Sequence, residues 1–361
     1  MDKKYKSGLV LGKFLPLHRG HCYLINSAAN GCEKLTVLAC SLKNEPIPGY
    51  LRYNWVKTFC EKSASFEGAC ERKVIHITEE LPQFPEEHPQ FWEIWCDLIK
   101  KNCPDIDVIY SSEDYGFELA KRLGITHELV DKERKKHPIS GTKIRNNPYD
   151  NWDNIYIGAR SYFINRIYFL GPESTGKSTT SKLLADKFDV NWVPEYGRIL
   201  YEEKNGELDL MDFYQIVIKQ REIENKLCER TQDKLIFCDT ETITTKVFCE
   251  LYYPEECHKL SEFFDYHIKK QLENKCHFFI MYPKLTEAVQ DGTRKFLDYQ
   301  ARTKHYDMII AELKKWEISH TVLTGDHKFR ESMVENYIKK ILPSDSNEET
   351  LSYVANKLNG K

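Results

Sequence analysis

A chain of 361 residues is longer than a single hydrophobic core usually supports, so its length favours two domains. Hydrophobic residues make up 41% of the chain and charged residues 30%, a composition typical of a soluble globular protein rather than a disordered one. No apolar run approaches the roughly 18 residues of a membrane-spanning helix, and a formal net charge of −3 argues against a protein that coats nucleic acid.

The N-terminal residues and the cysteines both indicate a cytoplasmic protein. The first residues are basic, but the apolar stretch after them is short and leads directly into a motif, so we expect no signal peptide. The 12 cysteines are scattered and form no C-x-x-C pair, which predicts neither a zinc site nor a disulfide framework. Thiols in a reducing compartment are the simpler interpretation.

Short β-branched runs alternate with amphipathic stretches of helical length, which is the βαβ pattern of parallel sheets in an α/β protein. The strands expected in the first half are Gly8–Leu11, Leu35–Ala39, Val74–Ile77, Val108–Tyr110 and Glu128–Val130. Those expected in the second half are Ile167–Leu170, Asn191–Val193, Leu235–Cys238, Phe278–Met281 and Thr321–Leu323. Each half therefore predicts its own mainly parallel sheet of about five strands. A turn-rich segment at 146–151 and an aromatic stretch after it favour domains of residues 1–165 and 166–361.

A loop rich in glycine and histidine follows the first predicted strand. It reads G-K-F-L-P-L-H-R-G-H from Gly12 to His21 and leads into a helix-like stretch. His18 and His21 stand three residues apart at this helix start, where imidazole donors and the helix dipole favour an anion. Metal binding is the alternative, but no third ligand of matching spacing occurs. We therefore interpret the loop as a phosphate site.

A second polar segment, I-S-G-T-K-I-R from Ile139 to Arg145, follows the last predicted strand of the first half. The hydroxyls of Ser140 and Thr142, backbone N–H groups and a bidentate arginine form another set suited to phosphate. A simple helix cap by Ser140 would explain the serine, but it would not explain why Lys143 and Arg145 follow.

The strongest motif lies in the second half, where G-P-E-S-T-G-K-S from Gly171 to Ser178 satisfies G-x-x-x-x-G-K-[ST]. It stands between an apolar strand and a helix-like stretch, as a P-loop should. In such a loop backbone N–H groups surround the phosphates, Lys177 reaches the β and γ oxygens, and Ser178 ligates Mg²⁺. The motif predicts a nucleoside triphosphate site.

Other charged residues of the second half could complete this site. Asp239 ends an apolar strand, and Glu241 follows it. A carboxylate there could hold Mg²⁺ through water or accept the proton of an attacking hydroxyl, whereas the simpler alternative is that Asp239 caps the next helix. Arg294 and Arg302 could reach the phosphoryl group from a mobile lid, or could be solvated surface charges.

Taken together, these segments resemble known families. The first two motifs, G-x-F-x-P-x-H-x-G-H and I-S-x-T-x-I-R, are similar to those of the HxGH nucleotidyltransferases, which include the nicotinamide mononucleotide (NMN) adenylyltransferases. Followed in order by the P-loop, E-Y-G-R from Glu195, D-T-E-T-I-T-T from Asp239 and D-G-T-R from Asp291, they make the chain resemble the NadR-type bifunctional enzymes from about residue 7 to 340.

The chain departs from that resemblance in two places. NadR-type repressors begin with a helix-turn-helix domain, whereas here the first predicted strand starts within ten residues of Met1, so we do not expect DNA binding. The family often has aspartate at the position of Glu241, which makes the role of that residue less secure.

The resemblance implies a Rossmann-like nucleotidyltransferase domain followed by a P-loop kinase domain. The first would join NMN to ATP, giving NAD and pyrophosphate. The second would phosphorylate the 5′-hydroxyl of ribosylnicotinamide with ATP and Mg²⁺, so the kinase product would be the transferase substrate. The implied partners are these small molecules, with no nucleic acid or membrane partner, and a homo-oligomer is left open.

The resemblance also implies roles for individual residues. The implied catalytic groups are Lys13, His18, His21, Arg145, Lys177 and Asp239. Those implied to bind ATP are Gly12, Phe14, Ser140, Thr142, Gly171, Glu173, Ser174, Thr175, Gly176, Lys177, Ser178, Thr179, Arg294 and Arg302. Those implied to bind the other substrates are Trp95, Glu195, Tyr196, Arg198, Asp239 and Glu241, and Mg²⁺ would be held by Ser178 and Asp239.

Trp95 has two interpretations. Its ring could stack on the cationic nicotinamide ring. The alternative is an ordinary core stripe, because Trp92 and Trp95 are spaced i, i+3 on a helix.

Two other functions are left open. A fused phosphopantetheine adenylyltransferase and dephospho-coenzyme A kinase would show the same two phosphate motifs, but it lacks support from the segments that begin at Glu195 and Asp239. A regulatory protein that senses nucleotides and turns them over poorly would also carry both sites.

Overall fold

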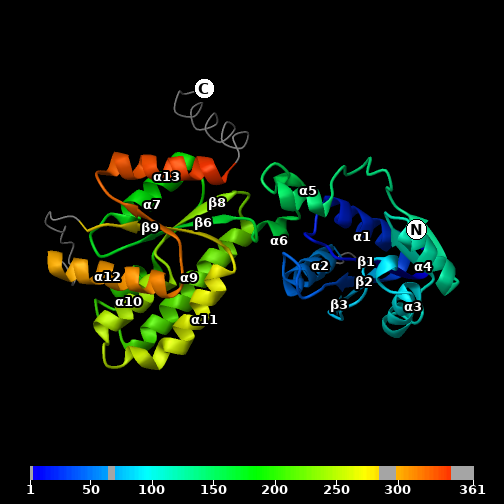
Figure 1. Ribbon diagram of the computed structural model, residues 1–361, viewed down its shortest axis with the longest axis horizontal. Helices are drawn as coiled ribbons and strands as arrows, with labels where there is room; N and C mark the ends of the chain where they lie inside the picture. The colour runs from blue at the N-terminus through cyan, green and yellow to red at the C-terminus, as the bar shows by residue number, and fades with distance from the viewer. Residues whose placement is uncertain (1–2, 64–69, 284–297, 343–361) are drawn as a thin grey trace, which may run out of the picture. The chain divides into compact units, whose positions relative to one another are not determined.

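The computed structural model describes residues 3–63, 70–283 and 298–342 (Figure 1). The chain splits into two compact units, Met1–Arg160 and Ser161–Lys361. Each unit is an α/β structure around its own parallel sheet, as the alternation of apolar runs predicts, and each is described by itself.

The first unit contains a five-stranded sheet of order β3-β2-β1-β4-β5 in which all neighbours are parallel. Its strands are β1 (Tyr5–Gly12), β2 (Cys32–Cys40), β3 (Glu71–Ile77), β4 (Val108–Ser111) and β5 (Thr126–Leu129). The strand order reverses between β1 and β4. In sheets of this kind ligands bind outside the carboxyl ends of the strands at such a switch point.

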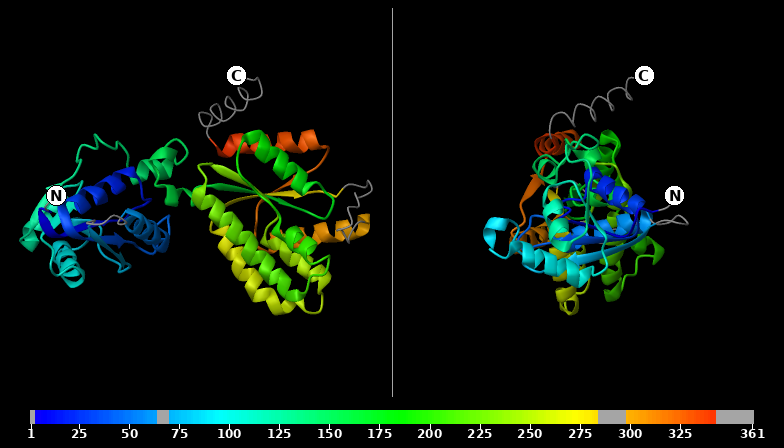
Figure 2. Two further views of the ribbon diagram at one scale, coloured as in Figure 1. Left: turned by 180° about the vertical axis from the view of Figure 1, so that it is seen from behind. Right: turned by 90° about the vertical axis from the view of Figure 1, so that its right-hand side faces the viewer.

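Helices cover both faces of this sheet. They are α1 (Arg19–Gly31), α2 (Gly49–Ser63), α3 (Phe91–Asn102), α4 (Tyr115–Leu123), α5 (Gly141–Asn146) and α6 (Ile157–Arg160), with 3₁₀ turns η1 (Pro85–Glu87) and η2 (Trp152–Asn154). Helices α3 and α4 pack their apolar side chains on Leu9, Leu38 and Ile109 of the sheet. Helices α1 and α2 contact strands β1, β2 and β3, and right-handed crossovers place them on the opposite face (Figure 2).

The second unit contains a five-stranded parallel sheet of order β10-β9-β6-β8-β7. Its strands are β6 (Asn165–Leu170), β7 (Trp192–Val193), β8 (Leu235–Asp239), β9 (Lys275–Met281) and β10 (His320–Leu323). The central strand β6 is buried at every residue, which explains why it reads as a nearly continuous apolar run rather than an alternating one.

The helices of the second unit form two layers around its sheet. They are α7 (Lys177–Phe188), α8 (Tyr196–Glu203), α9 (Leu210–Arg230), α10 (Thr242–Tyr252), α11 (Ser261–Leu272), α12 (Tyr299–Lys315) and α13 (His327–Ile341), with the 3₁₀ turn η3 (Cys257–Leu260). Helices α7 and α13 lie on one face, and α9, α10, α11 and α12 lie on the other (Figures 1 and 2).

All ten predicted strands are present, which confirms the α/β interpretation. The predicted and observed strands differ only in where they begin and end. Strand β9 begins three residues earlier than Phe278, because polar residues continue the pairing with β6 beyond the apolar run. Strand β7 is limited to Trp192 and Val193 at the sheet edge.

All twelve cysteines lie within the described residues and are free thiols. Across residues 3–63, 70–283 and 298–342, no helix is both long and apolar enough to cross a membrane.

Candidate active sites

The histidine loop of the first unit connects the central strand β1 to helix α1. His18 is the N-cap of α1, and its Nδ1 accepts a hydrogen bond from the His21 N–H at 3.4 Å. The two imidazole rings stack, with centroids 3.7 Å apart and planes inclined by 21°. Gly20 makes this arrangement possible, because a Cβ atom there would lie only 3.1 Å from the His18 ring. The loop thus places both imidazoles at the carboxyl end of the sheet.

Both imidazoles are held in the neutral form. Burial lowers the pKa of His18 to about 2, and the charges of His21, Arg134 and His137 act in the same direction. Burial also lowers the pKa of His21 to about 4, although a hydrogen bond with the Pro16 backbone opposes the shift. The Nδ1 atom of His21 is buried and makes no hydrogen bond to any described residue. A phosphate oxygen would supply a partner, and its charge would raise both pKa values.

These lowered pKa values predict that the histidine pair contributes a loss of stability as the pH falls from about 6.5 towards 4. In that range an unfolded imidazole takes up a proton that the folded one does not, so acid favours unfolding by about 1.4 kcal/mol per pH unit for each imidazole. Above about pH 6.5 neither state is protonated and the effect vanishes. Denaturant unfolding at several pH values would measure the slope. His21→Asn should remove the share of one imidazole, and an unchanged slope would contradict the assignment.

Phe14 and Gly12 shape the start of the loop. Phe14 has a left-handed backbone, with φ of 48°, and its side chain is 1% exposed. Its ring meets the His21 ring edge to face, with centroids 5.1 Å apart. A Cβ atom on Gly12 would lie 3.5 Å from the same ring. Phe14 therefore packs on the imidazole of His21 and fixes its orientation.

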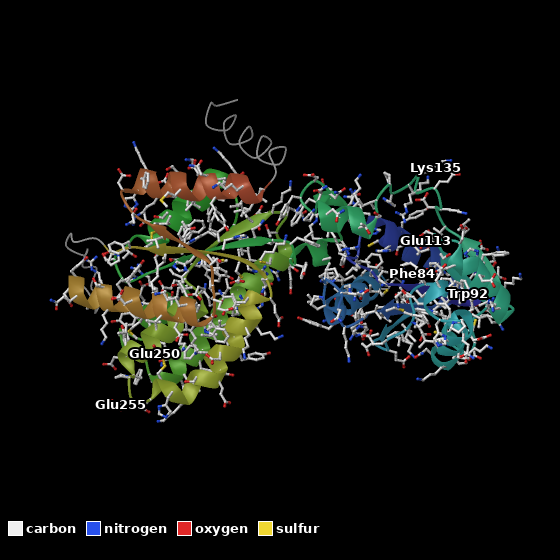
Figure 3. All side chains as sticks on the ribbon, in the orientation of Figure 1. Phe84, Trp92, Glu113, Lys135, Glu250 and Glu255 are labelled. Atoms are coloured by element: carbon white, nitrogen blue, oxygen red, sulfur yellow. The ribbon has the colours of Figure 1, made fainter. Side chains whose placement is uncertain are left out.

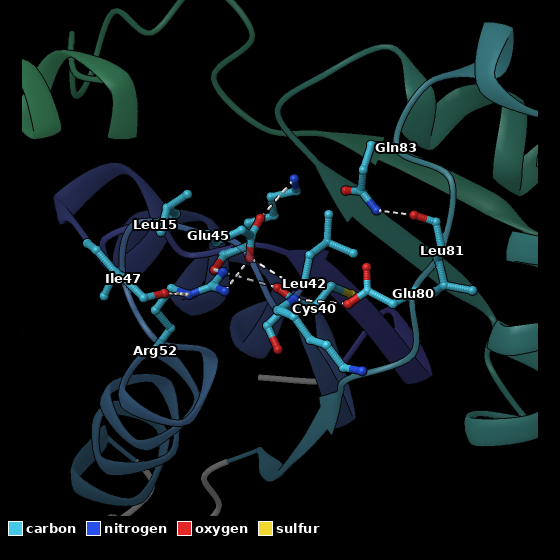
Figure 4. Close-up of polar contacts among 12 residues, drawn as sticks. Leu15, Cys40, Leu42, Glu45, Ile47, Arg52, Glu80, Leu81 and Gln83 are labelled. Carbon is cyan, nitrogen blue, oxygen red and sulfur yellow. Dashed lines mark hydrogen bonds and ion pairs between the residues drawn. The ribbon is translucent and has the colours of Figure 1, made fainter.

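The side chain of Lys13, the residue that follows β1, pairs with a carboxylate that the sequence did not single out. Lys13 Nζ lies 2.9 Å from Oε1 of Glu45, which also pairs with Arg52 and accepts a hydrogen bond from the Leu42 N–H at 3.0 Å (Figure 4). Burial alone would raise the pKa of Glu45, but these hydrogen bonds and the charge of Arg52 hold it below its usual value. Glu45 is therefore a fixed anion that orients the ammonium group of Lys13.

Arg52 ties together the backbone around this carboxylate. Its side chain is 1% exposed and donates to the carbonyls of Lys13 at 2.6 Å, Ile47 at 3.1 Å and Cys40 at 3.2 Å (Figure 4). Lys13 directly follows β1 and Cys40 ends β2, so the guanidinium joins the carboxyl ends of these two neighbouring strands. Glu45 and Arg52 belong to no motif, and no signal in the sequence distinguishes them from surface charges.

The second phosphate motif of this unit lies against the first. Ser140 caps α5 by accepting a hydrogen bond from the Lys143 N–H at 3.2 Å, so the cap considered as the simpler alternative is present. Gly141 approaches the histidine loop so closely that a Cβ atom there would lie 2.4 Å from the Leu15 carbonyl oxygen. Only glycine fits at this contact.

Arg145 links the two motifs directly. Its Nη1 donates to the Leu15 carbonyl at 2.5 Å, and its Nη2 donates to Oγ1 of Thr142 at 3.1 Å. The structure therefore brings the two segments together, with the guanidinium beside the loop that carries His18 and His21. Ser140 and Thr142 stand at the start of the same helix, whereas Lys13 is held by Glu45 next to the end of β1.

Trp95 lies on α3 within the core cluster that covers the sheet. Its side chain is 7% exposed, and its Nε1 donates to the Pro82 carbonyl at 3.0 Å. Trp92, labelled in Figure 3, instead has the Arg122 guanidinium 5.5 Å from its ring centre. The burial of Trp95 favours the core interpretation of the i, i+3 pair over an open stacking surface.

The P-loop of the second unit connects the central strand β6 to α7. Gly171 and Gly176 have φ values of 139° and 92°, conformations that favour glycine. Gly171 also approaches β9, since a Cβ atom there would lie 2.9 Å from the Met281 carbonyl oxygen. Lys177 is 8% exposed, and its Nζ donates to the carbonyls of Gly171 at 2.9 Å and Pro172 at 3.0 Å. The ammonium group is thus desolvated and held across the mouth of its own loop.

Two carboxylates face this ammonium group. Asp239 ends β8, next to β6, and is 2% exposed; burial raises its pKa, although Lys177 acts in the opposite direction. Burial and the charge of Asp239 raise the pKa of Glu195 to about 7, again against the effect of Lys177. The Oδ1 atom of Asp239 is buried and accepts no hydrogen bond from the described residues. Such an oxygen is suited to a cation or a substrate hydroxyl.

A cavity opens beside the P-loop, with one polar end and one aromatic end. The polar end is formed by P-loop residues from Glu173 to Thr179 together with Glu195, Gly197 and Arg198. The other wall comes mainly from α8, α9 and α10 and is formed by Tyr201, Leu208, Phe213, Ile216, Thr245, Phe248 and Tyr252. This combination suits a ligand that carries a ring and presents a hydroxyl to the phosphates.

The sequence did not identify the aromatic wall. Apart from Leu208, its members are spread over three helices, where apolar residues usually belong to the core. Only the positions of Phe213, Phe248 and Tyr252 beside the P-loop distinguish them from core.

The remaining predicted residues lie in different surroundings. Glu241 is 2% exposed and caps α10, accepting hydrogen bonds from the N–H groups of Ile243 at 2.6 Å and Thr244 at 2.7 Å. Helix α10 is therefore capped by Glu241 rather than by Asp239, the alternative considered from the sequence. With both oxygens engaged by the helix, Glu241 does not line the cavity.

Arg198 lines the cavity, where its Nε donates to Glu202 at 2.9 Å. Tyr196 and Arg302 do not line it: the backbone of Tyr196 bonds Gln220, and Arg302 is buried in α12. Arg294 lies outside the described residues.

The fold and these sites define a two-domain α/β protein whose second domain is of the P-loop kinase-like class. A family model described as an AAA domain matches residues 166–330. The trifunctional NAD biosynthesis/regulator protein NadR of Escherichia coli (strain K12) is 28% identical over 336 residues, which cover 87% of this chain and 77% of that protein. The chain is NadR-like over most of its length.

Solved structures agree on the fold. A crystal structure of NadR protein in complex with NR has a TM-score of 0.74 and 22% identity, covering 94% of this chain and 98% of that one. A second, in complex with NAD and AMP-PNP, has a TM-score of 0.73 and 21% identity, covering 97% and 98%. Both likenesses extend across the two domains.

Proposed function

We propose that this protein is a bifunctional enzyme of NAD biosynthesis, in which residues 1–165 transfer an adenylyl group from ATP to NMN and residues 166–361 phosphorylate ribosylnicotinamide. The observation that carries the proposal is the likeness to NadR across both domains at once, since a shared P-loop or histidine loop alone would not select the pyridine substrates. The kinase product is then the substrate of the transferase.

In the first domain the reaction needs no covalent intermediate, because the phosphate of NMN is itself a nucleophile. It attacks the α-phosphorus of ATP, the bond to the β-phosphate breaks, and pyrophosphate leaves. Catalysis then consists of alignment and charge stabilisation. We assign these roles to His18, His21, Lys13 and Arg145, with Ser140 and Thr142 holding phosphate oxygens.

In the second domain the ribose 5′-hydroxyl attacks the γ-phosphorus of ATP and ADP leaves. Lys177 would leave its two carbonyl partners for phosphate oxygens, and the unpaired carboxylate oxygen of Asp239 would accept or orient the hydroxyl proton. Glu195 and Arg198 stand at the polar end of the cavity, where they would contact the ribose. The pyridine ring would lie on the aromatic wall.

The residues present fit a magnesium ion. The Ser178 hydroxyl at the start of α7 and the Asp239 carboxylate at the end of β8 are hard oxygen donors, and Mg²⁺ in nucleotide sites typically takes one or two such protein ligands besides phosphates. Mg²⁺ would neutralise charge on the β- and γ-phosphates when bound.

A product assay tests both reactions. The full chain is incubated with ribosylnicotinamide, ATP and Mg²⁺, and NMN and NAD are quantified separately by chromatography. We expect both products, and NAD alone when NMN is supplied in place of the riboside. A failure to form NMN would refute the proposed kinase activity. A failure to form NAD from NMN would refute the proposed transferase activity. Turnover of phosphopantetheine instead would favour the coenzyme A alternative.

A further inference from the structure

The P-loop is contacted from behind by an arginine of the last described helix. Arg330 lies in α13 and is 2% exposed. Its Nη1 donates to the carbonyl of Thr175, within the P-loop, at 2.7 Å, and its Nη2 donates to the carbonyl of Tyr282 after β9 at 3.4 Å. The Sδ atom of Met281 lies 3.6 Å from Nη1. The Arg330 guanidinium thus joins the P-loop to the carboxyl end of β9.

This buried cation has no anionic partner in the part of the chain that the structure describes. Arg330 makes no ion pair with any described residue, and its Nε is buried without a hydrogen bond. Burial accordingly lowers its pKa. Buried arginines are normally paired with a carboxylate, since an uncompensated buried charge is unfavourable. Arg166 of the same unit is paired in this way, with Glu224 at 2.8 Å. A buried guanidinium without a carboxylate partner among the described residues is suited to an anionic ligand.

The hydrogen bond from Arg330 to the Thr175 carbonyl also affects a backbone N–H group of the P-loop. The carbonyl of Thr175 and the N–H of Gly176 belong to one peptide group, so a cationic donor on the oxygen polarises the N–H and strengthens its donation to an anion. The start of α13 lies close to that peptide, because a Cβ atom on Gly176 would lie 3.3 Å from the His327 ring and 3.8 Å from Nη1 of Arg330.

We propose that Arg330 is a positioning residue of the P-loop, which orients the Thr175–Gly176 peptide and supplies a buried positive charge that the bound nucleoside triphosphate neutralises. The inference rests on the proposed nucleotide site of the second domain and extends it to a helix that the cavity does not include. The contribution of Arg330 to ligand affinity should therefore increase with the number of phosphates on the ligand and be absent for a nucleoside.

The test measures nucleotide binding at this loop in the full chain, which also carries a second ATP site. Protection of the peptide spanning 171–179 from hydrogen–deuterium exchange is titrated with ATP, ADP, AMP and adenosine, so that the first domain does not contribute. In Arg330→Met the half-saturating ATP concentration should rise about tenfold or more, with a smaller rise for ADP, a still smaller one for AMP and none for adenosine. Arg330→Lys, which keeps the charge, should recover part of the loss.

A matched control is available on the same helix. Lys328→Met removes one positive charge from an exposed side chain of α13 and should leave all four titrations unchanged. An equal weakening of all four ligands by Arg330→Met would mean that the residue only maintains the fold, and no weakening would refute the proposal outright. If the P-loop is not protected by ATP in the wild-type chain, the inference also fails. ATP protection without formation of NMN would refute the proposed kinase activity while leaving this inference intact.

Discussion

Replacement of Lys177 by methionine should lower phosphorylation of ribosylnicotinamide by about 10³-fold or more, the range seen when a cation that stabilises a transferring phosphoryl group is removed. The ammonium group is already desolvated and held by the carbonyls of Gly171 and Pro172, so it needs little rearrangement to reach phosphate oxygens. Adenylyl transfer from supplied NMN should stay within about twofold of the wild-type rate, because we assign that reaction to residues of the first unit. Both rates are read from one chromatographic assay.

The matched control for this variant is Lys182→Met. Lys182 is an exposed residue of the same helix, α7, with its Nζ 5.7 Å from the Trp192 ring centre and away from the P-loop lining. The Lys182→Met variant should retain both the kinase and the adenylyl transfer activity. A Lys177→Met protein that kept its kinase activity would contradict the assignment of the loop, and loss of both activities would indicate misfolding instead.

The second large effect concerns the histidine pair. Replacement of His21 by asparagine should lower adenylyl transfer to NMN by about 10²- to 10³-fold, the usual loss for one donor aimed at developing charge. His21 is suited to that role because its buried Nδ1 lacks a partner among the described residues and its ring is held between His18 and Phe14. Phosphorylation of the riboside should be unaffected, and initial rates of NAD and NMN formation would show the difference.

His18 allows the cap to be separated from the chemistry. Asparagine is a favoured N-cap, so His18→Asn should keep helix α1 stable, whereas His18→Ala should also cost about 1 kcal/mol of stability. If His18 acts on phosphate, both variants should lose adenylyl transfer to a similar extent. Full activity of His18→Asn would show that His18 serves only as a helix cap.

Much of the fold could be predicted because buried parallel strands leave short apolar runs in the sequence. Strand β6 is the clearest case, since every residue is buried and the run leads directly into a contiguous P-loop. The two motifs of the first unit could also be recognised, because each is a continuous segment of the sequence. The contact that joins them, from Arg145 to the Leu15 carbonyl, could only be seen in the structure.

The rest of the sites depends on residues brought together by tertiary packing. Glu45 and Arg52 orient Lys13 from a loop and a helix that show no motif, and Arg330 reaches the P-loop from 155 positions away in the chain. The carboxylate that caps the helix after β8 was left open for a different reason. The residue at which the helix starts decides which carboxylate is the N-cap, and because α10 starts at Thr242 the N-cap is Glu241.

The short helix α5 has a consequence for affinity at the first site. The half of the site that contains His18 and His21 follows a strand paired on both sides and is preorganised, whereas α5 has six residues, too few for a helix to be stable alone. Its contacts with the histidine loop, through Gly141 and the Arg145 guanidinium, therefore hold the segment from Gly141 to Asn146 in its helical form. Replacement of Arg145 would remove this anchor together with a proposed phosphate donor, so its effect on nucleotide affinity would combine the two losses.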